Sequence, residues 1–228
     1  MKKMWLVLLL LITLSGCSAP HAVIEWVDFI KWNGKMYDGI GTGVLADEKY
    51  LGKKVGEVKF KVSENVNDPY YKMKDGDAAF HQKGTPIYAI KGNPQFLAVK
   101  DSDMVHGYHM YFVRTKNDSS WHFKDMPLDK VNRIEIYERY TSNGTKRINE
   151  IKDDGKIQQF LSILKNSREQ SNYNPNTEKG DPIFYEMVFY TDEPIAYKFW
   201  LQYDMVHYFW APWDTNVLSN EIGKFIMD

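Results

Sequence analysis

Apolar and polar residues alternate in short runs along most of the chain, and this pattern predicts β-strands. Between residues 57 and 62, the apolar residues Val58, Phe60 and Val62 share one face while charged residues occupy the other, as in a half-buried strand. Similar short runs recur up to Arg114, separated by turns rich in Gly, Pro, Asn and Asp. The spacing, about 8–12 residues, favours a small all-β sandwich-like or barrel-like module over residues 22–118.

Turn sequences indicate where these strands reverse. Asn33-Gly34 is a strong short hairpin signal; it follows the apolar run Val23 to Trp32 and precedes the expected return strand Lys35 to Tyr37. Glycines at every second position from 39 to 43 then predict a flexible loop. Further short strands are expected at 78–80, 87–90, 96–99 and 105–114.

The pattern changes after the polar stretch 116–120, where we place a domain boundary. Two strands, 133–137 and 147–151, are expected around Asn143-Gly144, and Asp153 or Asp154 is placed to cap a helix. A polar loop over 167–181, three more strands and a last helix capped by Ser219 follow. The expected buried helical positions are Ile157, Phe160, Leu161 and Leu164 in the first helix and Leu218, Ile222, Phe225 and Ile226 in the last.

This order predicts an α+β domain over residues 119–228, with two helices packed on an antiparallel sheet. The predicted fold class is therefore mixed β and α+β: a β-rich domain at 22–118 followed by the α+β domain. A chain of this length has enough residues to bury a core in each.

The first residues have the composition of an export signal. Lys2 and Lys3 precede an apolar run from Trp5 to Leu14, which is too short to span a bilayer. Leu14-Ser15-Gly16-Cys17 follows, and Cys17 is the only cysteine in the chain.

These four residues resemble the lipobox of bacterial lipoproteins. The resemblance implies a signal peptide at 1–16, cleavage before Cys17, a diacylglyceryl group on its sulfur, and a short lipidated linker at 17–21. The expected location is the extracytoplasmic face of the cell membrane, with the protein held by its lipid anchor. The alternative is an ordinary secretory signal followed by a chance cysteine.

A weaker resemblance covers nearly the whole chain. Asp28-Phe29-Ile30, the stretch Leu51 to Val58, and Ile87-Tyr88-Ala89-Ile90-Lys91-Gly92 are similar to segments of uncharacterised surface lipoproteins of Gram-positive bacteria. This resemblance implies two extracytoplasmic domains and supplies no catalytic residues.

Charge and cysteine content exclude several classes of function. The chain has 29 Lys and Arg against 30 Asp and Glu; without Lys2 and Lys3 the mature net charge is near −3, which argues against a nucleic-acid partner. With Cys17 lipidated, no thiol remains for disulfides, thiol catalysis or cysteine metal ligation.

Metal chemistry has one weak pattern. His106 and His109 lie near Met104 and Met110, and Met and His ligands suit copper(I). Residues three apart on a strand point to opposite sides, so both would bind one ion only at a bulge, with help from residues such as Met205 or His207. We expect no metal site and no cofactor. Asp75-Gly76-Asp77 and Asp101-Ser102-Asp103 are explained as turns rather than calcium ligands.

The sequence lacks several known catalytic motifs: there is no Gly-x-Ser-x-Gly elbow, no His-Glu-x-x-His and no Ser-x-x-Lys together with its companion motifs. We therefore expect a protein that is not an enzyme and has no catalytic residues. A cell-envelope, glycan-directed hydrolase stays as the alternative, because two carboxylates far apart in sequence sometimes meet in a cleft.

Aromatic residues supply the candidate ligand-binding residues. Trp200 and Trp210 are expected to face away from the buried sets of their strands, and Trp213 follows shortly after. Rings exposed in this way mark partner or ligand sites, here an envelope protein or glycan. The competing explanation is that a helix or the first domain covers that face. The sequence thus predicts a membrane-anchored, non-catalytic binding module, and a Met/His copper-binding lipoprotein is a further, weaker alternative.

Overall fold

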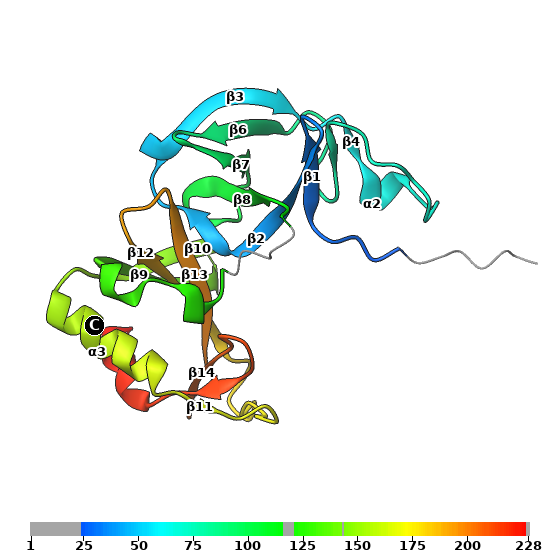
Figure 1. Ribbon diagram of the computed structural model, residues 1–228. Coiled ribbons are helices and arrows are strands. Elements are labelled where there is room, and N and C mark those ends of the chain that lie inside the picture. Colours follow the sequence, from blue (N-terminus) through cyan, green and yellow to red (C-terminus); the bar gives the residue numbers. More distant parts are fainter. Residues whose placement is uncertain (1–23, 116–120, 143, 227–228) are drawn as a thin grey trace, which may run out of the picture.

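The computed structural model describes residues 24–115, 121–142 and 144–226 and consists mostly of antiparallel β-sheet with few helices (Figure 1). The prediction of a β-rich, α+β class is confirmed at this level. The lipobox Leu14 to Cys17, the linker 17–21 and the expected boundary near 118 lie outside the described residues. Among those described, no helix is both long enough and apolar enough to cross a bilayer.

The first half is built from short strands in the order β2-β8-β7-β6-β3, with β1 paired to β2 and β5, and β4 paired to β5 in parallel. The strands are β1 (Phe29–Trp32), β2 (Lys35–Leu45), β3 (Leu51–Glu57), β4 (Phe60–Lys61), β5 (Asp77–Ala78), β6 (Pro86–Ile90), β7 (Asn93–Lys100) and β8 (Tyr108–Val113). Three short helical turns lie between them: η1 (Glu48–Tyr50), α2 (Val62–Asn65) and η2 (Val105–Gly107).

The predicted hairpin between β1 and β2 is confirmed. Trp32 pairs with Lys35 across the turn, and both Asn33 (φ 47°) and Gly34 (φ 72°) have positive φ. A two-residue turn with two positive φ angles matches the right-handed twist of the flanking strands, and Asn-Gly adopts it at low cost. The preceding strand is shorter than predicted, because only Phe29–Trp32 of the described stretch 24–32 forms a strand.

The glycines at 39–43 do not form the predicted loop; they lie inside β2. The register of β2 against β8 shifts between Gly39 and Val44, so the strand is bulged there. A Cβ on Gly39 would lie 2.3 Å from Asp28 Oδ2, and one on Gly43 would lie 2.8 Å from Ile40 Cγ2. The lack of a side chain at Gly39 and Gly43 therefore allows Asp28 and Ile40 to pack closely against β2.

Two other predicted strands are shortened by turns. The run 57–62 is divided between the end of β3, the short β4 and the start of α2, although Val58 and Val62 are fully buried as predicted. The run 105–114 begins with the helical turn η2, in which His106 has φ 63°, and continues as β8. Apolar alternation identified Val58 and Val62 as buried but did not indicate the turns.

The second half has the sheet order β10-β9-β12-β13, with β14 beside β13. Its strands are β9 (Arg133–Thr141), β10 (Gly144–Ile151), β11 (Arg168–Glu169), β12 (Ile183–Tyr190), β13 (Ile195–Tyr203), β14 (Tyr208–Trp210) and β15 (Asn216–Val217), and its helical elements are η3 (Phe123–Asp125), η4 (Leu128–Lys130), α3 (Asp154–Lys165) and η5 (Asn220–Phe225).

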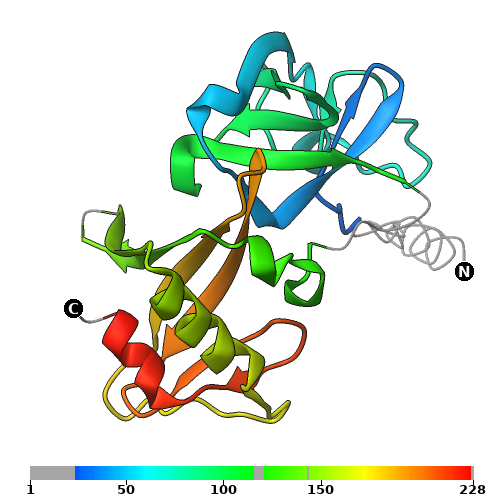
Figure 2. The same cartoon turned by 60° about the vertical axis from the view of Figure 1, so that its left-hand side comes forward.

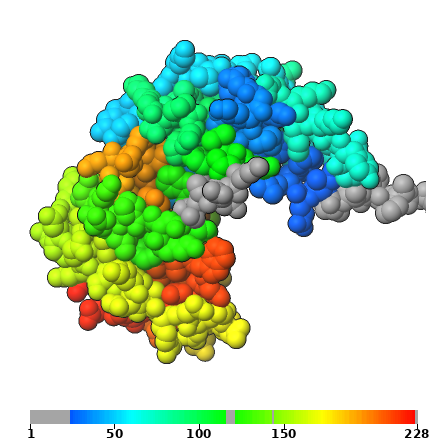
Figure 3. All heavy atoms as spheres, in the orientation of Figure 1, coloured from blue at the N-terminus to red at the C-terminus, as the bar shows by residue number. Residues whose placement is uncertain are grey.

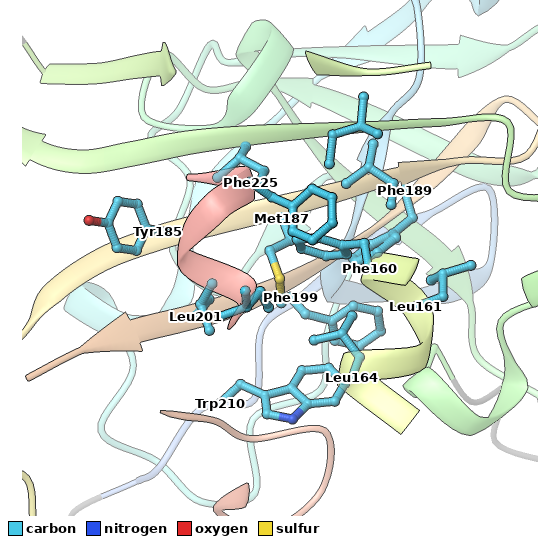
Figure 4. Packing of buried hydrophobic residues seen from close by; sticks show 14 of the residues in the cluster. Phe160, Leu161, Leu164, Tyr185, Met187, Phe189, Phe199, Leu201, Trp210 and Phe225 are labelled. Carbon is cyan, nitrogen blue, oxygen red and sulfur yellow. The ribbon is translucent and has the colours of Figure 1, made fainter. Parts of the chain in front are cut away.

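The predicted helix α3 is confirmed, with Asp153 Oδ1 accepting a hydrogen bond from the Lys156 amide as its N-cap (2.9 Å). All four predicted apolar positions of α3 are buried against one face of the sheet. Figure 4 shows Phe160, Leu161 and Leu164 in this core with Met187, Phe189 and Phe199 of β12 and β13.

The last predicted helix has the predicted cap and buried residues but a different geometry. Ser219 caps it, and Leu218, Ile222, Phe225 and Ile226 are buried, yet η5 is a 3₁₀ helix. The element is short and contains Gly223, whose Cβ would lie 3.1 Å from Tyr208 Oη. Glycine leaves room for the Tyr208 ring, but it also weakens α-helix formation. A short 3₁₀ turn is enough to bury the four apolar residues.

A short strand pairing joins the two halves into one hydrogen-bonded sheet. Leu45, Val44 and Gly43 of β2 pair with Ile195, Ala196 and Tyr197 of β13. In Figure 2, β13 rises from the second half to meet β2 at the base of the first. Each half also has apolar clusters of its own, and two more clusters combine residues from both.

Candidate ligand-binding face

The sheet of the second half has a face opposite α3 and η5, which we call the outer face. Because successive residues of a strand point to opposite faces, the residues that alternate with the core-facing ones point to this side. Register aligns them across strands: Glu186 of β12 lies between Tyr137 of β9 and Trp200 of β13, and Val188 lies between Glu135 and Lys198. The outer face is therefore a mixed charged and aromatic surface.

The first half covers part of this face. Val105 in η2 packs with Val188, Tyr190 and Ala196. The backbone oxygen of Asp103 accepts a hydrogen bond from Arg139 Nη1 (2.7 Å). The segment 101–107 thus covers part of the outer face. This agrees with the competing explanation from the sequence, that the first domain covers that face.

Beneath this cover lies a group of three charges. Lys198 Nζ is 3.3 Å from Glu186 Oε1, and Arg139 Nη1 is 3.6 Å from Glu186 Oε2. Glu186 and Lys198 are buried. Glu186 Oε2 and Arg139 Nε have no hydrogen-bond partner among the described residues. Buried charges of this kind are expensive unless paired, so the ion pairs hold the three side chains in place.

Three aromatic rings lie at the uncovered edge; we call Tyr140, Phe184 and Trp200 the ring patch. The ring centroids of Tyr140 and Phe184 are 5.6 Å apart, and those of Phe184 and Trp200 are 6.4 Å apart, both nearly perpendicular. The Arg139 guanidinium lies 5.6 Å from the Tyr140 ring centroid and 5.7 Å from that of Trp200. Cation–π and edge-to-face contacts thus hold the rings together.

An open groove of about 870 Å³ borders the ring patch. It runs between the segment 101–107 and the β9–β10 hairpin. Its polar lining combines hydroxyl, carboxyl, guanidinium and imidazole groups, and its residues include Ser102, Asp103, His106, Tyr137, Arg139, Tyr140, Thr141 and Thr145. An aromatic edge beside convergent polar groups is typical of a small-molecule or oligomer binding site.

The three predicted tryptophans do not come together. Trp200 is 37% exposed and belongs to the ring patch, whereas Trp213 is 81% exposed and contacts the ring of His122 (5.0 Å between centroids). The predicted exposure of Trp210 is wrong: it is 1% exposed and packs on Phe123. Trp210 pairs with Leu201 across β13 and β14, and directly opposed residues point to the same side, here the core.

Sequence reasoning missed Tyr140, Phe184 and the three charges. One signal for the charges is present, since Glu186 and Lys198 are the charged residues within the largely apolar runs Ile183–Tyr190 and Ile195–Tyr203. A charged residue inside such a run is buried and paired or lies at a site. The ring patch had no comparable signal, because it depends on register between distant strands.

A hydrogen-bonded network connects the cover to the sheet. Tyr190 donates to Glu135, so the short contact between His106 Nε2 and Tyr190 Oη (2.7 Å) places a proton on His106 Nε2. Burial raises the pKa of Glu135, but hydrogen bonds from Tyr137 and Tyr190 and the nearby arginines outweigh it, and the net pKa is lowered. Burial lowers the pKa of His106, and Glu135 offsets this only in part.

A second network of the same type lies in the first half. Tyr111 donates to Asp28 Oδ1 (2.9 Å), His81 Nε2 lies 2.6 Å from Tyr111 Oη, and His109 Nε2 lies 3.3 Å from Asp28 Oδ2. Burial raises the pKa of Asp28 and lowers the pKa values of His81 and His109. Carboxyl and imidazole groups shifted in this way also occur in catalytic sites.

The histidines considered for copper are separated by these networks. His106 contacts Tyr190, whereas His109 stacks on Tyr111 beside Asp28, so the structure does not bring the two to one site. Within the described ranges, no group of three or more His, Cys, Asp or Glu side chains is arranged to hold a metal ion.

Comparison with known proteins adds no family: no family model matches the chain, and neither the curated proteins nor the solved structures contain a match.

The lowered pKa of His106 predicts a pH effect on stability. In the unfolded chain an imidazole takes up a proton near pH 6.5, whereas the buried His106 stays neutral to lower pH. The free energy of unfolding should therefore fall as pH is lowered from 7.5 to 5.5. Denaturant unfolding of the His106→Asn variant, whose side chain does not titrate, should show a smaller fall than the wild type. Equal falls in the two proteins would contradict the lowered pKa of His106. The pKa of Glu135 is lowered, so this carboxyl stays ionised between pH 7.5 and 5.5 and does not cause the fall.

Proposed function

We propose that the chain is a lipid-anchored, extracytoplasmic lipoprotein whose folded part is a non-catalytic module that binds an envelope glycan. The anchor is supported by the lipobox-like Leu14-Ser15-Gly16-Cys17 behind a short apolar run. The observation that carries the binding role is the ring patch beside the polar groove on the outer face.

We further propose two domains: an all-β, sandwich-like or barrel-like module at 22–118, and an α+β domain at 119–228. The separate apolar clusters support this division, since the large cluster under α3 contains residues of the second region alone. The β2–β13 pairing then forms the junction between the domains.

A glycan fits the groove better than a flat protein surface does. A sugar ring has an apolar C–H face that packs on an aromatic ring, and hydroxyl groups at its rim. The groove offers both kinds of contact, with Tyr140 beside the hydroxyl groups of Thr141, Thr145 and Ser102 and the guanidinium of Arg139. The buried Glu186 holds Arg139 and Lys198 in position, so the site is preorganised.

Two carboxylates near the groove, Glu135 and Glu186, support a binding role rather than hydrolysis. A glycosidase needs a proton-donating carboxyl with a raised pKa. Glu135 has a lowered pKa and accepts hydrogen bonds from Tyr137, Tyr190 and Arg147. Glu186 is paired with two cations.

A glycan-directed hydrolase is the second candidate, and the Asp28 network favours it. The raised pKa of Asp28, next to two uncharged imidazoles, is the combination that acid–base catalysis uses.

The anchor is tested by metabolic labelling with an alkyne fatty acid. The wild-type protein should incorporate the label and sediment with membranes, whereas Cys17→Ala should do neither. Thermal unfolding of both proteins is the control, so that loss of the fold is not taken for loss of the anchor. Label retained in the variant, or absent from the wild type, would contradict the proposal.

The binding site is tested by titrating soluble cell-wall glycan fragments into the protein. Trp200→Ala should weaken binding about 30-fold, since truncating an aromatic residue that contacts the ligand costs about 2 kcal/mol. Trp213→Ala is the matched control, an exposed tryptophan outside the ring patch, and should bind as the wild type does.

Two results would overturn this account. Equal loss of binding in both variants would remove the ring patch from the site. Release of reducing ends by the wild type, abolished in Asp28→Asn, would establish the hydrolase in place of the binding module.

A further inference from the structure

Chain length limits how far the fold can lie from a lipid on Cys17, an inference that rests on the proposed anchor. Seven peptide steps separate Cys17 from Ile24, the first described residue, and fully extended they span about 25 Å at most. A globular chain of about 200 residues has a radius of gyration of about 16 Å and is therefore wider than this tether is long. The end of the fold near Ile24 must lie against or close to the bilayer.

That end of the fold exposes large apolar side chains. Val27 is 67% exposed, Tyr70 86% and Phe80 48%. Trp26 directly precedes Val27 and packs against Phe29, with 6.2 Å between ring centroids. Tyrosine and tryptophan are the side chains enriched where a protein meets the membrane–water interface.

A small buried cluster gives these side chains a common base. It consists of Phe29, Val62, Val66 and Ala79, with Trp26, Phe60 and Tyr71 packed around it. The Ala79 amide donates to Phe29 O (3.0 Å), and the Ser63 amide donates to Ala79 O (3.2 Å). The exposed residues Val27, Tyr70 and Phe80 are therefore the sequence neighbours of residues that pack together in one unit made from β1, α2 and the segment after β5.

The views of the whole molecule agree on this placement. Figures 1 and 3 show the first described residues, in blue, beside α2 and the following loop at one end of the molecule. Figure 1 shows β9 and β12, which carry much of the outer face, in the other half of the molecule. An end placed on the membrane thus leaves β9, which lines one side of the groove, in the half of the molecule away from that end.

The charge of this end is nearly balanced. Residues 59–83 contain Lys59, Lys61, Lys72, Lys74 and Lys83 against Glu64, Asp68, Asp75 and Asp77, and Lys61 is paired with Glu64. Attraction to anionic lipid therefore contributes little, and contact depends on burying apolar and aromatic surface.

We propose that Trp26, Val27, Tyr70 and Phe80 form a membrane-contact surface that rests on the bilayer holding the Cys17 lipid. Contact there replaces free rotation on the tether by one orientation, in which the ring patch and groove are held away from the bilayer.

The test uses the full lipidated chain in phosphatidylcholine vesicles that contain nitroxide-labelled lipid. Because the lipid occupies the sulfur of the only native cysteine, a thiol-reactive fluorophore labels a newly introduced cysteine alone. Tyr70→Cys reports on the proposed surface. Tyr140→Cys is the matched control, because Tyr140 is also a highly exposed tyrosine but lies on the ring patch.

The fluorophore at residue 70 should lose intensity in the nitroxide vesicles, while that at residue 140 should keep it, at low and high salt alike. Adding Val27→Ser and Phe80→Ser to Tyr70→Cys should reduce the loss at residue 70 without changing the circular dichroism spectrum. Equal quenching at 70 and 140, or quenching unaffected by the serine substitutions, would overturn the proposed surface.

Flotation and mass spectrometry separate this failure from failure of the anchor. A chain that floats with the vesicles and carries fatty acid, yet shows equal quenching, overturns the contact surface alone. A chain without fatty acid that stays with the soluble fraction overturns the proposed anchor, and the contact surface with it.

Discussion

The backbone pairing between β2 and β13 is the constraint on which the arrangement of the molecule depends. Two halves with their own apolar clusters become one sheet through the pairs at residues 43–45 and 195–197. The close approach needs a glycine at 43, whose Cβ would lie 3.2 Å from Ile195 Cγ2. The same pairing brings the segment 101–107 onto the outer face, because β8, which follows that segment, pairs with β2.

Partial covering of the outer face explains why charged residues lie inside apolar strands. Glu186 and Lys198 would be unfavourable at the centre of an apolar core, and removing one partner of such a pair typically costs about 3–5 kcal/mol. Here Glu186 pairs with both cations and holds Arg139 next to the ring patch and beside the groove. The proposed binding function uses the ring patch and the groove, which lie where the cover formed by the segment 101–107 ends.

Local features of the fold were predictable from the sequence, and long-range ones were not. The Asn33-Gly34 hairpin and α3 with its Asp153 cap depend on residues close in the chain. Whether the glycines of β2 form a loop or a bulged strand depends on partners such as Asp28 and Ile195. Trp210 was misplaced for the same reason, since its side of the sheet is set by pairing with Leu201. Of the candidate site, the sequence indicated Trp200 alone, because the positions of Tyr140 and Phe184 follow from cross-strand register.

Amide hydrogen exchange at the junction tests the central claim, that β2–β13 pairing joins the halves. The Ala46 amide donates to the Pro194 carbonyl (2.9 Å) at the end of this pairing. The account predicts that Ala46 and the neighbouring junction amides exchange as slowly as amides in the middle of β12, because opening them requires separating the two halves. Exchange at Ala46 as fast as in an unprotected loop would contradict the account, since the two halves would then move independently.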